Sequence, residues 1–326
     1  MDVASFCAAS RVLIVAGKGG VGKTTMTAAL ARMAADGGMS VLVVELEGRP
    51  GIPAAFDGRR PEHPLGYDEA ALYDAPGGGT VRGRRLTPDD ALLEYLADHG
   101  LQRVSKRLVS SGVIDVVATA IPGIRDVLVL GKVKQLEQDG VADLVVVDAP
   151  ATGHAMTFLT SARGLLDAAR SGPVRSQAED VVALLSDPSR CRVVLVTLPE
   201  EMPVSETVEA GYQLEDRAGV QLGPVIVNGW DDLSGSLTVG TAEAADAANV
   251  RLGTDELAAL EAARLFRAHR HELAAEQVER LARELPLPQL PTPALATPSI
   301  GPDEIGVLSR ALAEGVERLA TEPEGR

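Results

Sequence analysis

The stretch Gly17–Thr25 reads GKGGVGKTT and fits the spacing G-x-x-x-x-G-K-[ST]. Before it lies RVLIVA (11–16), a short apolar and β-branched run that predicts a buried strand. After it comes TTMTAALARMAADGG (24–38), which has helical composition and a Gly-Gly stop. Glycines between a strand and a helix let backbone N–H groups turn inward around phosphates, and the helix adds its positive N-terminal end. We therefore predict a phosphate-binding loop at this point of the chain.

The side chains of this loop have separate expected roles toward a bound nucleotide. Lys23 is expected to reach the β- and γ-phosphates, and the Thr24 hydroxyl is expected to ligate Mg²⁺. The chain has five lysines, and two of them lie in this loop. The other loop residues are expected to bind phosphate oxygens through their backbone; they are Gly17, Lys18, Gly19, Gly20, Val21, Gly22 and Thr25.

Composition narrows the class of protein. Of the 326 residues 45% are hydrophobic and only 3% aromatic, so the core must be aliphatic. The net charge of −15 argues against binding the phosphate backbone of nucleic acid, which needs a basic surface. No stretch approaches the roughly 18 apolar residues of a membrane span, and no secretory leader is visible. A cytoplasmic protein without direct membrane insertion is expected. Cys7 and Cys191 have no metal-ligand spacing and are expected to be buried or incidental thiols.

Apolar runs alternate with helical segments along the chain. Runs of this kind, apolar throughout, indicate a parallel sheet that is covered on both faces. The sequence therefore predicts an α/β fold with a doubly wound, mostly parallel sheet, in a single domain spanning residues 1–326. The expected strands are 11–16, 40–48, 143–151, 193–200 and 223–230, with 285–291 along an edge.

The segments between these strands have different expected structures. Residues 50–90 are rich in Gly, Pro and Arg and are expected to form loops and short turns. Residues 88–138 are expected to form a helical insertion, which is either a partner-binding lid or simply a covering layer of the sheet. The Pro-rich stretch 286–302 reads as a surface connection. The helix after it has apolar residues at helical spacing and is expected to pack on the body; they are Ile305, Leu308, Leu312 and Leu319.

Four segments together resemble one family. KGGVGKTT (18–25) resembles the deviant Walker-A motif, and DAPATGHAMTFL (148–159) resembles the switch segment of ArsA-type anion-pump ATPases and of their relatives that target tail-anchored membrane proteins. LPEEMPVSET (198–207) and PVIVN (224–228) follow in the expected order. The resemblance covers nearly the whole chain and implies a P-loop NTPase that binds ATP and Mg²⁺ and hydrolyses ATP.

Lys18 lies too early in the loop to reach the phosphates of its own nucleotide easily alongside Lys23. In the resembling nucleotidases this lysine reaches across a dimer interface to the partner's ATP, as an arginine finger does. The resemblance therefore implies a catalytic Lys18 and a dimer, either of identical chains or with a paralogue. The alternative is an ordinary solvated lysine.

Two acidic positions carry over from the resemblance. Asp148, at the end of the third expected strand, corresponds to the acid that orients the water shell of Mg²⁺, so Thr24 and Asp148 form the expected metal site. Glu47 falls where the family places the aspartate that positions the attacking water, and Glu45 lies two residues earlier on the same face. Glutamate is one methylene longer than aspartate, so slow hydrolysis is also open. Gly51 stands where a relative would have a polar residue.

Asn228 ends the fifth expected strand and resembles the residue that reads the adenine edge through its side-chain amide. Because Gly229 follows it, the alternative is a turn asparagine. His154 is expected to be a structural hydrogen-bonding residue of the switch.

These features favour a dimeric, Mg²⁺-dependent ATPase that couples nucleotide-driven closure to a partner, with a membrane protein as one candidate. One alternative is a positioning ATPase of the MinD and ParA kind. Another is a nucleotide-dependent scaffold with low turnover that pairs with a paralogue. Two isolated cysteines cannot form a three-thiolate arsenite site, so activation by arsenite is not expected.

Overall fold

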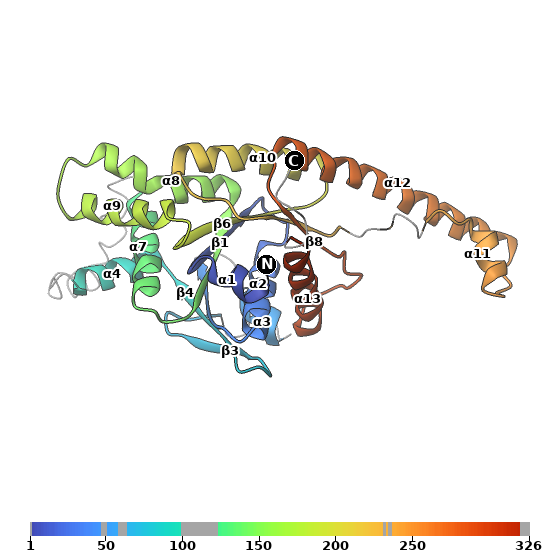
Figure 1. The fold of residues 1–326 in the computed structure, drawn as a ribbon, viewed down its shortest axis with the longest axis horizontal. Coiled ribbons are helices and arrows are strands. Elements are labelled where there is room, and N and C mark those ends of the chain that lie inside the picture. The colour runs from blue at the N-terminus through green and yellow to red at the C-terminus, as the bar shows by residue number, and fades with distance from the viewer. Residues whose placement is uncertain are drawn as a thin grey trace.

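A computed structural model describes residues 2–46, 51–57, 64–98, 123–230, 233 and 237–319. Its centre is an eight-stranded sheet with the order β3-β4-β2-β5-β1-β6-β7-β8 (Figure 1). All neighbouring strands are parallel except β3 and β4, which are antiparallel. The strands are β1 Val12–Gly17, β2 Ser40–Leu46, β3 Ala70–Asp74, β4 Thr80–Leu86, β5 Leu144–Ala151, β6 Cys191–Thr197, β7 Val225–Asn228 and β8 Gln289–Thr292.

Helices cover both faces of this sheet. On one face, α1, α2 and α13 share a core with Leu13, Val15 and Val146. On the other face, α7, α8, α9 and α10 pack against Val12, Ile14 and the strand residues that alternate with the first set. The predicted doubly wound, mostly parallel α/β fold is therefore confirmed. The helices are α1 Val3–Ala8, α2 Lys23–Asp36, α3 Ile52–Asp57, α4 Pro88–Asp98, α7 Ile124–Gln138, α8 Thr152–Ala168, α9 Pro173–Ser186, α10 Glu201–Gln213, α11 Thr241–Ala247, α12 Thr254–Glu284 and α13 Pro302–Leu319.

The prediction of loops and short turns for residues 50–90 is wrong. This stretch contains the short helix α3 and the strands β3 and β4, and β4 extends the sheet beyond β2 in parallel register. The sequence of β4, TVRGRRL, has three arginines and a glycine, and this composition does not predict a strand. At Gly83 within it, Leu72 Cδ1 lies 2.6 Å from where a Cβ would be, so apolar side chains of neighbouring segments fill the space beside the glycine.

The expected insertion at 88–138 is described only in part. α7 is a covering helix, with Leu130, Val133 and Leu136 buried against the sheet, and α4 packs on it. Residues 99–122 lie outside the described residues, so the choice between a lid and a covering layer stays open for that part.

The C-terminal helix behaves as its pattern predicts. Ile305, Leu308 and Leu312 are buried, and α13 packs against α2 and β8. The apolar stripe of this helix is therefore a core face rather than a membrane-binding one. In the described part of the chain, no helix is long and apolar enough to cross a membrane.

A long helical arm is the feature that the sequence analysis leaves unassigned. α12 spans 31 residues, leaves the body beside α10 and carries α11 at its far end (Figure 1). Leu281 is its one buried residue, whereas Leu265 and Phe266 are 53% and 67% exposed. Side chains one helical turn apart form ion pairs along it, such as Arg280 with Glu284 at 2.9 Å. Such pairs support a helix that has little tertiary packing.

The two cysteines are buried and free, as expected. Burial raises the pKa of each thiol to about 12, so the thiolate that reacts with alkylating reagents and binds metalloids is scarce near neutral pH.

We predict that neither Cys7 nor Cys191 is labelled by a thiol reagent in the native protein and that both are labelled after unfolding. Mass spectrometry before and after denaturant checks this. Rapid native labelling of either thiol would contradict the packing around it.

Candidate nucleotide-binding site

The phosphate-binding loop lies where the sheet topology requires it. β1 ends at Gly17 and α2 begins at Lys23, so the loop crosses the carboxyl end of the central strand. A Cβ on Gly17 would overlap the carbonyl oxygen of Val196. Only glycine at this position therefore lets the loop lie so close to β6. Gly22 has φ 91°, and a Cβ there would lie 2.5 Å from Asn228 Nδ2. Steric demands therefore account for two of the motif's glycines.

Lys23 bends back over its own loop. Its Nζ donates a hydrogen bond to the Lys18 carbonyl oxygen at 2.9 Å. Burial lowers the pKa of Lys23, and the nearby charge of Asp148 acts in the opposite direction. The ammonium is therefore held above the loop, where the β- and γ-phosphates of a nucleotide would be its strongest partners.

Thr24 and Asp148 contact each other directly. Thr24 Oγ1 donates to Asp148 Oδ2 at 2.6 Å, and Thr27 Oγ1 lies 3.4 Å from Asp148 Oδ1. Burial raises the pKa of Asp148 to about 6, against the lowering effect of the Thr24 hydrogen bond and of Lys23. A bound cation would favour the ionised form of this carboxyl group. The two residues predicted from the sequence to serve Mg²⁺ are thus side by side.

Glu45 is the neighbour of Asp148 on the next strand. The two residues are in register between β2 and β5. Glu45 is 2% exposed, and its Oε1 accepts a hydrogen bond from Gly51 N at 2.7 Å and lies 3.4 Å from Ile52 N. Burial raises the pKa of Glu45, and the Gly51 and Ile52 N–H groups and Arg85 reduce the rise. The carboxylate therefore anchors Gly51 and the start of α3.

The second oxygen of Glu45 supports a cation site. Oε2 is buried and has no hydrogen-bond partner among the residues that the structure describes. A buried carboxylate oxygen of this kind needs a partner, and a hard cation with its water shell takes oxygen ligands. The set of Thr24, Asp148 and Glu45 therefore fits Mg²⁺ in the chemistry of its donors. The described ranges, this site included, contain no group of three or more His, Cys, Asp or Glu side chains that could hold a metal without further ligands.

The stretch expected to carry the water-positioning acid is described only on either side of residues 47–50. Glu47 lies outside the described residues, so its water-positioning role stays a prediction. Gly51 lies within them, and a Cβ there would be 2.7 Å from Thr24 Cγ2. This contact explains why glycine stands where a polar residue was expected: a side chain would displace the threonine of the metal site.

We predict that Glu45→Ala lowers Mg-ATP hydrolysis by roughly 10- to 100-fold, the usual effect of losing an outer-shell partner. The reason is that Gly51 N–H loses its acceptor and the segment after β2 loses its anchor. Glu45→Gln is the matched variant, because its carbonyl oxygen can still accept that hydrogen bond. It should be faster than the alanine variant in a phosphate-release assay, because it keeps the anchor and loses only the charge and the second acceptor oxygen. If the glutamine variant is as slow as the alanine variant, anchoring is not the role of Glu45.

The Asn228 side chain connects the phosphate-binding loop to strand β8. Its Nδ2 donates to the Val21 carbonyl oxygen at 2.8 Å, and its Oδ1 accepts from Thr292 Oγ1 at 3.3 Å. Gly229 follows with φ 78°, so a turn does begin there. The amide keeps one N–H and one lone pair free of these two bonds. Adenine reading by Asn228 therefore remains a prediction, and holding the loop is a role that the sequence analysis did not foresee.

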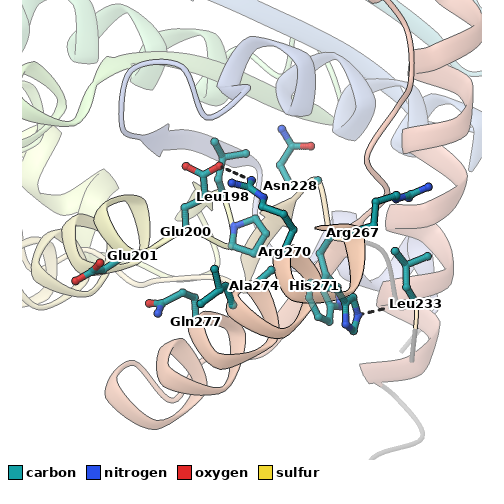
Figure 2. Close-up of a pocket in the computed structure, with 14 residues that line it drawn as sticks. Leu198, Glu200, Glu201, Asn228, Leu233, Arg267, Arg270, His271, Ala274 and Gln277 are labelled. Carbon is teal, nitrogen blue, oxygen red and sulfur yellow. Dashed lines mark hydrogen bonds and ion pairs between the residues drawn. The ribbon is translucent and has the colours of Figure 1, made fainter. Parts of the chain in front are cut away.

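An open cavity of about 440 Å³ adjoins Asn228. Figure 2 shows that it is bounded by the β6–α10 connection, the end of β7 and the base of α12. The Trp230 and His271 rings stack at its edge with centroids 4.9 Å apart. Arg270 pairs with Glu200 at 3.7 Å. The base of the arm therefore lies close to Asn228, which contacts the phosphate-binding loop at Val21.

Lys18 points toward α10 of its own chain. Its Nζ donates to Glu206 Oε1 at 2.6 Å, with side chains that are 33% and 35% exposed. The predicted action across a dimer interface concerns a second subunit and stays a prediction. His154, at the start of α8, is exposed. Burial raises the pKa of Asp126, and the neighbouring His154 and Arg125 reduce the rise.

The fold and the site together define a P-loop nucleotide-binding protein. Residues 12–289 match the family model described as the CobQ/CobB/MinD/ParA nucleotide binding domain, and the chain belongs to this family. It is 41% identical over 227 residues to ATPase BagA of Mycobacterium tuberculosis, a match that covers 67% of this chain and 64% of BagA. The chain thus matches less than two thirds of that relative's length.

More distant relatives support the resemblance to the ArsA-type family. The chain is 28% identical over 223 residues to an arsenical pump-driving ATPase of Escherichia coli, covering 67% of this chain and 34% of that protein. An arsenical pump-driving ATPase of Acidiphilium multivorum is also 28% identical, over 227 residues, with 67% and 34% covered. The resemblance stated from the motifs is therefore confirmed, and ATP hydrolysis is consistent with the names of these relatives.

Proposed function

We propose that this protein is a Mg²⁺-dependent ATPase that works as a dimer and transmits its nucleotide-driven closure to a partner. The observation that carries the proposal is the meeting of Lys23, Thr24 and Asp148 at the carboxyl ends of β1 and β5. The proposal of hydrolysis also draws on the relatives named ATPases.

Each residue of the nucleotide site has a separate role in this proposal. Backbone N–H groups of Gly17–Thr25 and the start of α2 bind the phosphates, and Lys23 exchanges the Lys18 carbonyl oxygen for phosphate oxygens. Thr24 and Asp148 would hold Mg²⁺, which neutralises charge on the β- and γ-phosphates when bound. Glu45 fixes the segment after β2, and Glu47 on that segment positions the attacking water. Asn228 holds the loop through Val21 and contacts the adenine with its remaining amide capacity.

Dimerisation is proposed from Lys18. A lysine in this loop adds a second cation that the nucleotide of its own subunit does not need once Lys23 is in place. Delivered to the partner's nucleotide, it would stabilise charge in the transition state. Both a homodimer and a heterodimer with a paralogue satisfy this requirement.

Coupling to a partner is proposed from the relatives. Two of them are named as ATPases that drive an arsenical pump. The buried, weakly acidic thiols of this chain argue against arsenite as the activator here. A pump or another membrane protein as the partner is therefore part of the proposal, with a different transported species or cargo.

A positioning ATPase of the MinD and ParA kind is the second candidate, since the matching family model includes both. Pelleting with anionic lipid vesicles separates the two candidates. ATP-dependent binding of the isolated chain to vesicles would favour the positioning ATPase. The low-turnover scaffold predicts ATP binding with negligible phosphate release in a single-turnover assay.

The proposed metal dependence is tested by Asp148→Asn. We expect phosphate release from Mg-ATP to fall by roughly 10- to 100-fold, because the carboxylate that orients the Mg²⁺ water shell is lost. Asp143→Asn is the control: Asp143 lies at the opposite end of β5, where it binds Ser40. It should keep the wild-type rate. Equal rates for Asp148→Asn and wild type, or full activity in EDTA, would contradict a Mg²⁺ site at Asp148.

A further inference from the structure

We propose that Glu206 is a positioning residue of the ATPase site: it holds Lys18 within its own subunit until ATP-driven pairing draws that lysine to the second subunit. The inference rests on the proposed action of Lys18 across the dimer. It gives a role to Glu206, which belongs to the segment 198–207 and lies on a helix outside the phosphate-binding loop.

The geometry of the pair comes from the sheet order. β6 lies beside β1, so the helix that follows β6 begins at the same edge as the loop that follows β1. Glu206 lies in the second turn of α10, and its Oε1 is 2.6 Å from Lys18 Nζ. Glu209, one turn further along, accepts instead from Gln213 at 2.7 Å. Among the described residues of α10, Glu206 is the acid that forms an ion pair with the loop.

The backbone of residue 18 links this ion pair to the nucleotide. Lys23 Nζ donates to the Lys18 carbonyl oxygen, while the Lys18 side chain donates to Glu206. Phosphate oxygens of a bound nucleotide compete with that carbonyl oxygen for Lys23. The Lys18 carbonyl oxygen then loses this hydrogen bond, whereas the ion pair between the Lys18 side chain and Glu206 remains.

The strength of the pair suits a temporary restraint. Both side chains are about one-third exposed, so solvent screens their attraction. An exposed ion pair of this kind shifts an equilibrium by a factor of about 1.5 to 5. A triphosphate with its several negative oxygens is a stronger partner for an ammonium group than one carboxylate. The exchange from Glu206 to the nucleotide of a second subunit is therefore favourable.

The test is Glu206→Gln in the full chain, with Glu209→Gln as the matched control on the same helix. At protein concentrations where the dimer is only partly formed, Glu206→Gln should raise the rate of Mg-ATP hydrolysis by about two- to five-fold. Sedimentation should show its ATP-dependent dimer forming at a lower protein concentration by a similar factor. Glu206→Asp, which keeps the charge on a shorter side chain, should lie between glutamine and wild type. Glu209→Gln should match wild type.

The double variant shows whether Glu206 acts through Lys18. Lys18→Ala with Glu206→Gln should hydrolyse ATP as slowly as Lys18→Ala alone. A Glu206→Gln rate at or below the wild-type rate would overturn the inference, whereas the slow Lys18→Ala variant would still support the proposed function. If Lys18→Ala itself keeps the wild-type rate, the action across the dimer fails, and the inference fails with it.

Discussion

Lys23→Ala is expected to abolish ATP binding. The lysine is half-buried above the loop, and its ammonium is the cation nearest to the expected β- and γ-phosphates. Charge-assisted hydrogen bonds contribute roughly 1.5–3 kcal/mol each to the free energy of binding. Loss of the two expected from Lys23 to the β- and γ-phosphates therefore weakens ATP binding by about 100-fold or more. Titration of a fluorescent ATP analogue into the variant, in the presence of Mg²⁺, measures the effect.

The control for this variant is Lys134→Ala. Lys134 lies on α7 and pairs with Asp180 at 2.7 Å, away from the loop. Its replacement should leave nucleotide affinity unchanged. If Lys23→Ala binds ATP within a few-fold of wild type, the loop is not the phosphate site.

Lys18→Ala is expected to separate binding from hydrolysis. The nucleotide of the same subunit is served by Lys23, so its affinity should stay nearly intact. Hydrolysis should fall on the order of 10³-fold, because cations supplied in trans contribute 10³–10⁵ to phosphoryl transfer. A single-turnover assay at saturating Mg-ATP isolates this step from binding. A wild-type rate in that assay would make Lys18 an ordinary solvated lysine.

The sequence predicts the parts of the fold that depend on local pattern. The loop Gly17–Thr25 is recognisable because phosphate binding needs particular residues at fixed spacing, and the apolar strands because both of their faces are covered. β4 is missed because it lies toward one side of the sheet and contains Arg82, Arg84 and Arg85. The arm α12 is missed because a helix with one buried residue has no clear apolar stripe.

The candidate site likewise has residues that the sequence predicts and contacts that it does not. Thr24 and Asp148 are predictable because each belongs to a motif, and the structure brings them to 2.6 Å. The position of Glu45 beside Asp148 depends on β2–β5 register, which pairs residues 103 positions apart. The contact of Lys18 with Glu206 joins the phosphate-binding loop to helix α10 across 188 positions. No local pattern in the sequence reports such pairings; a carboxylate at the end of a buried strand was the one available signal for Glu45.

The proposed function requires that each ATP is hydrolysed with a lysine from the other subunit, and a mixture of two inactive variants tests this requirement. In a dimer of one Lys18→Ala chain and one Lys23→Ala chain, the first chain binds ATP and the second supplies Lys18. Equal mixing of freely exchanging chains makes half of the dimers mixed, with one working site each. We therefore expect recovery of about a quarter of the wild-type rate of phosphate release. A mixture that remains as slow as Lys18→Ala alone would contradict the claim.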